Sequence, residues 1–137
     1  IFIVGLLLPL IFGVFSAMYY VRVSSGVPQE TSIMVKKLFA WFNKHFPTTI
    51  PVPVYLCRCE SFFVSPDDSR LAAGLFRCRD KKCSIKISGG RKIAEVITIC
   101  LHEFVHFEQF RSGRPLTERG VRVRMRGLEN LIIKTRA

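Results

Sequence analysis

Apolar residues follow distinct patterns along the chain, and together they predict an α+β domain behind an apolar N-terminal segment. Residues 1–21, IFIVGLLLPLIFGVFSAMYYV, contain no charged side chain. A run of this length is enough to cross a bilayer as a helix, and the tyrosines before Arg22 are typical of a membrane interface. We therefore predict an N-terminal hydrophobic transmembrane or signal-anchor helix at residues 1–22. A cleaved signal peptide and a helix that packs on the domain are the alternatives.

Helical periodicity begins after a short polar linker at residues 23–30, VSSGVPQE. Leu38, Phe39 and Phe42 recur at the spacing of one helix face, which predicts an amphipathic helix at residues 33–46. Prolines at positions 47, 51 and 53 exclude a regular element from the next stretch.

Strand-like segments follow at residues 54–59, 71–79 and 84–88, and a turn at residues 80–82 joins the last two. Helical spacing returns at residues 93–105, and Gly113 with Pro115 marks the start of a closing helix. The predicted order is a helix, a small antiparallel sheet, a central helix and a closing helix, in one compact domain at residues 31–137.

The central helix carries the pattern His102-Glu103-x-x-His106. Histidines four residues apart lie on the same helix face, so both imidazoles can reach one metal ion. The glutamate between them points aside, where it can hold a metal-polarised water and act as general base. This is the minimum set of groups for zinc-assisted hydrolysis of a peptide bond. A buried helix with incidental histidines is the alternative, but it would leave costly unpaired polar groups.

Catalytic zinc normally takes three protein ligands, so one more is needed. The glutamates after His106 are Glu108, Glu118 and Glu129. Glu108 points roughly away from the histidines on the same helix. If the closing helix runs back antiparallel, Glu118 comes level with His106, whereas Glu129 lies beyond the pair. We predict Glu118 as the third ligand; the alternative is a first-turn glutamate that only complements the helix dipole.

At these residues the chain resembles the gluzincin metallopeptidases. Its short layout, over roughly residues 52–134, is similar to that of the minigluzincins. The resemblance implies zinc bound by His102, His106 and Glu118, with Glu103 as general base. Gluzincins often use a downstream tyrosine or histidine to steady the oxyanion, and neither residue type occurs after His106. Candidates to replace it are Arg111, Arg114, Arg119 and the upstream Tyr55.

The chain has a net charge of +11 and a pI near 10.0. Basic residues accumulate in its last third: Arg111, Arg114, Arg119, Arg122, Arg124, Arg126, Lys134 and Arg136. This distribution predicts contact with anionic lipid or nucleic acid, and the positive-inside tendency favours the cytoplasmic side of a membrane. A face that only keeps the protein soluble is the alternative.

The cysteines allow several states. Cys100 lies on the apolar helix face and is expected in the core. Cys57, Cys59, Cys78 and Cys83 could form a four-sulfur zinc site, and Cys78–Cys83 could form a disulfide across a hairpin. Free thiols are the expected state in a cytosolic domain.

The sequence therefore predicts a zinc-dependent endopeptidase that acts on protein or peptide substrates. It would be a single-pass membrane protein, tethered through residues 1–21 with its catalytic domain in the cytoplasm. Substrate would add as an extended strand along an exposed edge, such as residues 84–88. The alternatives are a DNA-associated protease similar to the SprT-like proteins, which also carry His-Glu-x-x-His, and a non-enzymatic basic binding module with a structural metal site.

Overall fold

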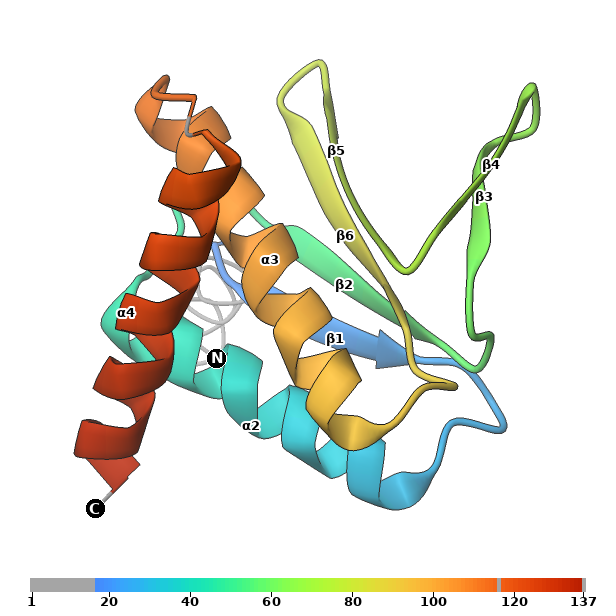
Figure 1. Cartoon of the computed structure of the whole chain (residues 1–137), viewed down its shortest axis with the longest axis horizontal. Coiled ribbons are helices and arrows are strands. Elements are labelled where there is room, and N and C mark those ends of the chain that lie inside the picture. Colours follow the sequence, from blue (N-terminus) through green and yellow to red (C-terminus); the bar gives the residue numbers. More distant parts are fainter. Residues whose placement is uncertain (1–16, 116, 137) are drawn as a thin grey trace, which may run out of the picture.

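A mixed β-sheet with helices on one face forms the framework of the domain (Figure 1). The computed structural model of the chain describes residues 17–115 and 117–136. Within these ranges the elements follow in the order β1 (Tyr19–Val23), α2 (Gln29–His45), β2 (Val52–Cys57), β3 (Phe62–Ser65), β4 (Asp68–Ala72), β5 (Gly74–Arg79), β6 (Lys82–Ser88), α3 (Ile93–Ser112) and α4 (Glu118–Arg136).

The main sheet has the strand order β1-β2-β6-β5. It is mixed, so the prediction of an antiparallel sheet is wrong. Strand β2 pairs in parallel with both β1 and β6, whereas β5 and β6 form an antiparallel hairpin. Strands β3 and β4 form a separate antiparallel hairpin. Parallel partners need long connections: α2 lies between β1 and β2, and β3, β4 and β5 lie between β2 and β6. The sheet therefore ends in two edge strands, β1 and β5.

The prediction of an N-terminal transmembrane helix is wrong for those of its residues that the structure describes. Its last residues belong to β1, which pairs with β2 from Tyr19 opposite Val52 onward. The rest of that prediction, residues 1–16, lies outside the described residues. In the part of the chain that is described, no helix combines the length and the apolar character needed to cross a bilayer. The predicted single-pass membrane location and the anchor ending at residue 22 are corrected accordingly, and the domain starts before residue 31.

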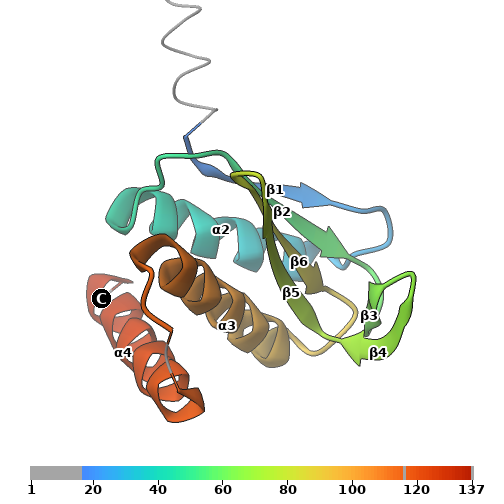
Figure 2. The ribbon, with the colours of Figure 1, turned by 90° about the horizontal axis from the view of Figure 1, so that it is seen from above.

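A single apolar core lies between the sheet and the helices. Alternate residues of β2 and β6 point into this core. Tyr55, which lies between two such residues in the sequence of β2, faces the opposite side of the sheet and is exposed. Figure 2 shows α2 and α3 along one face of the sheet and α4 in an outer layer. The largest buried side chains are Tyr19, Phe39, Phe42, Leu56, Ile85, Ile87, Leu101, Phe104, Phe107 and Leu128. Each such side chain contributes about 1.5–3 kcal/mol by leaving water, so the core holds α3 firmly in place.

Aromatic rings fix α3 against its neighbours. Phe104 of α3 stacks on Phe42 of α2, with ring centroids 3.9 Å apart and an interplanar angle of 4°. Tyr19 of β1 packs against both of these rings and against Phe107. Since Phe104 and Phe107 bracket His106 in the sequence, this packing determines which face of α3 turns away from the core.

Candidate metal centre

The two histidines lie on the side of α3 that the core leaves free. Leu101, Phe104 and Val105 are fully buried, whereas His102 is exposed and His106 half-buried. Helix α3 ends where Gly113 adopts a left-handed conformation with φ of 68°, as glycine does readily. The chain can therefore turn back at once and bring α4 alongside α3.

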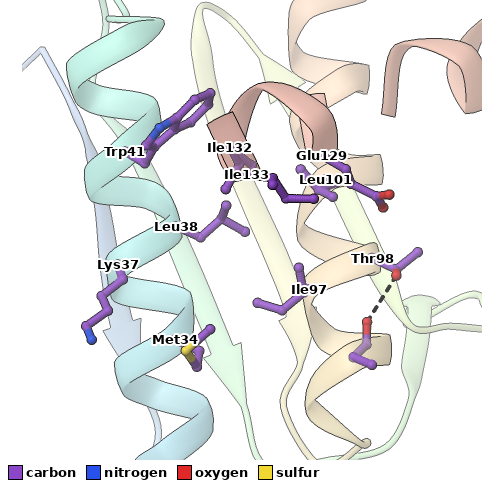
Figure 3. Close-up of a pocket in the computed structure, with 11 residues that line it drawn as sticks. Met34, Lys37, Leu38, Trp41, Ile97, Thr98, Leu101, Glu129, Ile132 and Ile133 are labelled. Carbon is purple, nitrogen blue, oxygen red and sulfur yellow. Dashed lines mark hydrogen bonds between the residues drawn. The ribbon is translucent and has the colours of Figure 1, made fainter. Parts of the chain in front are cut away.

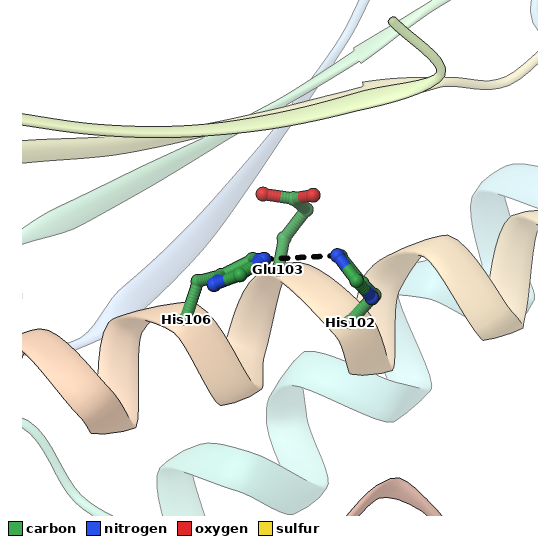
Figure 4. A group of neighbouring side chains, drawn as sticks. All are labelled: His102, Glu103 and His106. Atoms are coloured by element: carbon green, nitrogen blue, oxygen red, sulfur yellow. Dashed lines mark hydrogen bonds between the residues drawn. The ribbon is translucent and has the colours of Figure 1, made fainter. Parts of the chain in front are cut away.

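His102 and His106 point toward one another, with their Nε2 atoms 2.9 Å apart (Figure 4). Ligand atoms of His102, Glu103 and His106 all lie within 4.8 Å of one another. Two nitrogen ligands of a tetrahedral zinc ion, each about 2.0–2.1 Å from the metal, would be about 3.3–3.4 Å apart. The rings need to separate only slightly to reach that distance, so this group could hold a metal ion.

Gln109 sets the tautomer of His106. Its side-chain Oε1 lies 2.9 Å from His106 Nδ1. An amide oxygen only accepts hydrogen bonds, so Nδ1 donates and Nε2 keeps its lone pair. His102 Nε2 then donates to that lone pair in the metal-free protein. Partners of this kind orient metal-ligating histidines and raise their basicity.

The pKa of His102 is lowered by partial desolvation of its ring and by the neighbouring His106, while Glu118 acts in the opposite direction. Metal ions bind the neutral imidazole, so a lowered pKa increases the binding-competent fraction near neutral pH.

Glu103 points from α3 toward the strands, away from the line between the histidines (Figure 4). Only 5% of its surface is exposed. Burial raises its pKa to about 7, although a backbone hydrogen bond from Phe76 acts in the opposite direction. Gly74 of β5 lies directly against it, because a Cβ at that position would be 2.9 Å from Glu103 Cγ. A glycine at this point lets the sheet approach and desolvate the carboxyl group.

Three cavities open onto this group, and two of them reach both histidines. One of about 710 Å³ is lined by Gly74, Phe76, Glu103, Gln109 and both histidines, among others. The other, of about 350 Å³, is lined by His102, His106, Glu118, Val121 and Arg122. The histidines are therefore accessible both along β5 and along α4.

Of the candidate third ligands, the structure brings only Glu118 to the histidines. It lines their cavity, although it stands outside the group whose ligand atoms lie within 4.8 Å of one another. Glu108 instead pairs with Arg124, with 2.8 Å between Oε2 and Nη2. Glu129 lies further along α4, beside Leu101. Ligation by Glu118 therefore stays a prediction.

The candidates for steadying an oxyanion are not brought to the histidines. Arg111 donates a hydrogen bond of 2.9 Å to the Pro47 carbonyl, and Tyr55 lines a cavity beside the β3–β4 hairpin. Arg114 and Arg119 line neither of the two cavities at the histidines. Arg122, which was expected only to add to the basic charge, does line one of them. Its position four residues after Glu118, on the same face of the helix, was the available signal.

Cys78 and Cys83 form a disulfide across the β5–β6 hairpin. The expected free thiols are therefore wrong for this pair, and so is the four-sulfur zinc site. Cys57, Cys59 and Cys100 are free, and burial raises the pKa of Cys100 strongly. Cys100 is a core residue as predicted.

A further cavity of about 480 Å³ lies between α2, α3 and α4 (Figure 3). Apolar side chains such as Leu38, Ile97 and Ile132 form most of its wall. The Thr98 hydroxyl is used locally, since it donates to the Ala94 carbonyl at 3.0 Å. Neither histidine reaches this cavity, so it is separate from the candidate metal centre.

Comparison of the chain with protein-family models, with curated proteins and with solved structures gave no match. The assignment of the site therefore depends on its own residues.

Proposed function

We propose that the protein is a zinc-dependent endopeptidase in which His102, His106 and Glu118 hold the metal and Glu103 is the general base. The observation that carries the proposal is the histidine pair, with 2.9 Å between Nε2 atoms, beside a buried carboxyl group. Nitrogen and carboxylate ligands suit zinc, which would act as a Lewis acid when bound. The open cavities at the histidines favour an enzyme over a closed structural site.

Glu103 takes a proton from the attacking water and delivers it to the amine nitrogen that leaves. In the metal-free protein, burial raises the pKa of Glu103 to about 7, toward the range in which a general base works best. The strand beside it keeps bulk water away from the carboxyl group. Gln109 keeps the His106 ring in the orientation that directs Nε2 toward His102.

Strand β5 is the natural place for an extended peptide. It is the edge strand next to α3, and Gly74 and Phe76 line the larger cavity. A peptide can add to such an edge through backbone hydrogen bonds. The segment suggested earlier, residues 84–88, is wrong for this role because β6 lies between β2 and β5. A strand that has no paired neighbour on its outer side favours cleavage within a chain.

The test compares metal content and casein hydrolysis of the full chain and its variants. The variant Glu103→Gln is expected to keep its zinc and to lose about 10²–10⁴-fold in turnover, as for loss of a general base. His102→Ala is expected to lose both zinc and activity. The control is Glu95→Gln, an exposed glutamate on the same helix, which should behave as the wild type. Wild-type turnover by Glu103→Gln would refute the mechanism.

A further inference from the structure

Arg122 occupies a defined place at the candidate metal centre. It follows Glu118 by one turn of α4, and both residues line the 350 Å³ cavity with the two histidines. Val121 lies between them in sequence and is only 6% exposed. This buried side chain packs the first turns of α4 against the domain, and the exposed Arg122 that follows it lies at the cavity.

The guanidinium of Arg122 has no acidic partner. Among the residues that the structure describes, the salt bridges use Arg70, Arg91 and Arg124, and none uses Arg122. Glu118 is the one acidic residue that lines this cavity. If it binds zinc as proposed, its charge is directed to the metal, and Arg122 is left as the cation available to a ligand.

The net charge of the whole chain, +11, favours a positive potential around this cavity. The nearby Glu108 is neutralised by Arg124. Such a field attracts anionic ligands, and a guanidinium can hold a carboxylate through two parallel hydrogen bonds.

We propose that Arg122 is a specificity-determining residue that selects peptides with an acidic side chain beside the scissile bond. The inference rests on the proposed peptidase function and adds its substrate class. A charge-assisted hydrogen bond of this kind corresponds to roughly a ten- to hundredfold preference for glutamate over glutamine. The other role open to an arginine here, binding of the oxyanion, would accelerate all peptides alike.

The experiment uses pairs of peptides that differ only in Glu or Gln next to the bond that the enzyme cleaves in casein. The wild type is expected to show a kcat/KM for the Glu peptide at least tenfold higher than for the Gln peptide. Arg122→Gln should abolish this ratio by lowering only the value for the Glu peptide. Arg122→Glu should reverse the preference in favour of a Lys peptide. The matched control is Arg126→Gln, which removes an exposed arginine one turn further from the histidines and should keep the ratio.

Each outcome is decisive. Hydrolysis without a preference for the Glu peptide overturns the role of Arg122 and leaves the peptidase function standing. An equal loss for both peptides in Arg122→Gln also overturns it, and points to the oxyanion or to the fold. No hydrolysis of any peptide by the zinc-loaded wild type overturns the peptidase function and this inference together.

Discussion

Replacing Glu103 by glutamine is expected to stabilise the metal-free protein at neutral and alkaline pH, although the same change removes the proposed base. The carboxyl group is 5% exposed, and burial raises its pKa from 4.5 to about 7. A shift of one pKa unit corresponds to 1.36 kcal/mol, so the charged form costs the fold about 3 kcal/mol, as an upper bound. Glutamine has a similar shape and avoids this cost.

The pH dependence follows from the direction of the shift. Below pH 4.5 the carboxyl group is protonated in both the folded and the unfolded state, and the two proteins should be equally stable. Between pH 4.5 and about 7 the unfolded chain loses its proton first, so the folded wild type is progressively penalised. The advantage of the glutamine variant therefore grows across this range and levels off above it.

The assay is urea unfolding of the two full chains in the presence of a chelator, at pH 4.5, 6 and 8. Both proteins contain the same histidines, so their titration cancels from the difference in unfolding free energy. The control is Glu95→Gln on the exposed side of α3, which removes an exposed ion pair with Arg91 and should lower stability by no more than about 1 kcal/mol at any pH. If Glu103→Gln raises the unfolding free energy equally at all three pH values, or lowers it at pH 8, the argument from burial is refuted.

Further substitutions test the packing around the site. Tyr19→Ala should lower stability by about 3–5 kcal/mol in thermal or urea unfolding. By contrast, Tyr19→Phe should cost little, since the buried hydroxyl has no hydrogen-bond partner. Gly74→Ala places a Cβ 2.5 Å from Ile99 Cγ2 and 2.9 Å from Glu103 Cγ. It should reduce stability by about 1–3 kcal/mol and also reduce casein hydrolysis, and unchanged values would mean that the strand can shift freely. Gln109→Leu should weaken zinc binding about 10–100-fold in a chelator competition, and unchanged affinity would show that His106 needs no such partner.

Local features of the sequence predicted the helical part of the molecule well. The boundaries of α3 follow from helical spacing and from Gly113, and the histidine pair follows from the helix geometry alone. The proximity of Glu118 required only one further step, an antiparallel return after a tight turn. These inferences depend on residues that are close in the sequence.

The strand pairings were harder to predict, because the strands that pair are far apart in the sequence. The length of the apolar run that includes Tyr19 favours a membrane helix, and β2, the strand that pairs with its end, lies about thirty residues away. The insertion of β6 between β2 and β5 likewise has no local signal. Gly74 and Phe76 therefore could not be assigned to the site from the sequence, although they desolvate and contact Glu103.

The centre of the sheet also determines how the chain must be assembled. Tyr19 pairs with Val52, and Val54 with Ile85, so the parallel pairs close long loops and form slowly. Strands β5 and β6 and helix α3 are consecutive and leave the ribosome after β1, α2 and β2. Until β6 has been synthesised, β2 presents an unpaired edge to other chains. The second half of the domain therefore carries the candidate metal-binding histidines and also covers the edge that β2 leaves open until then.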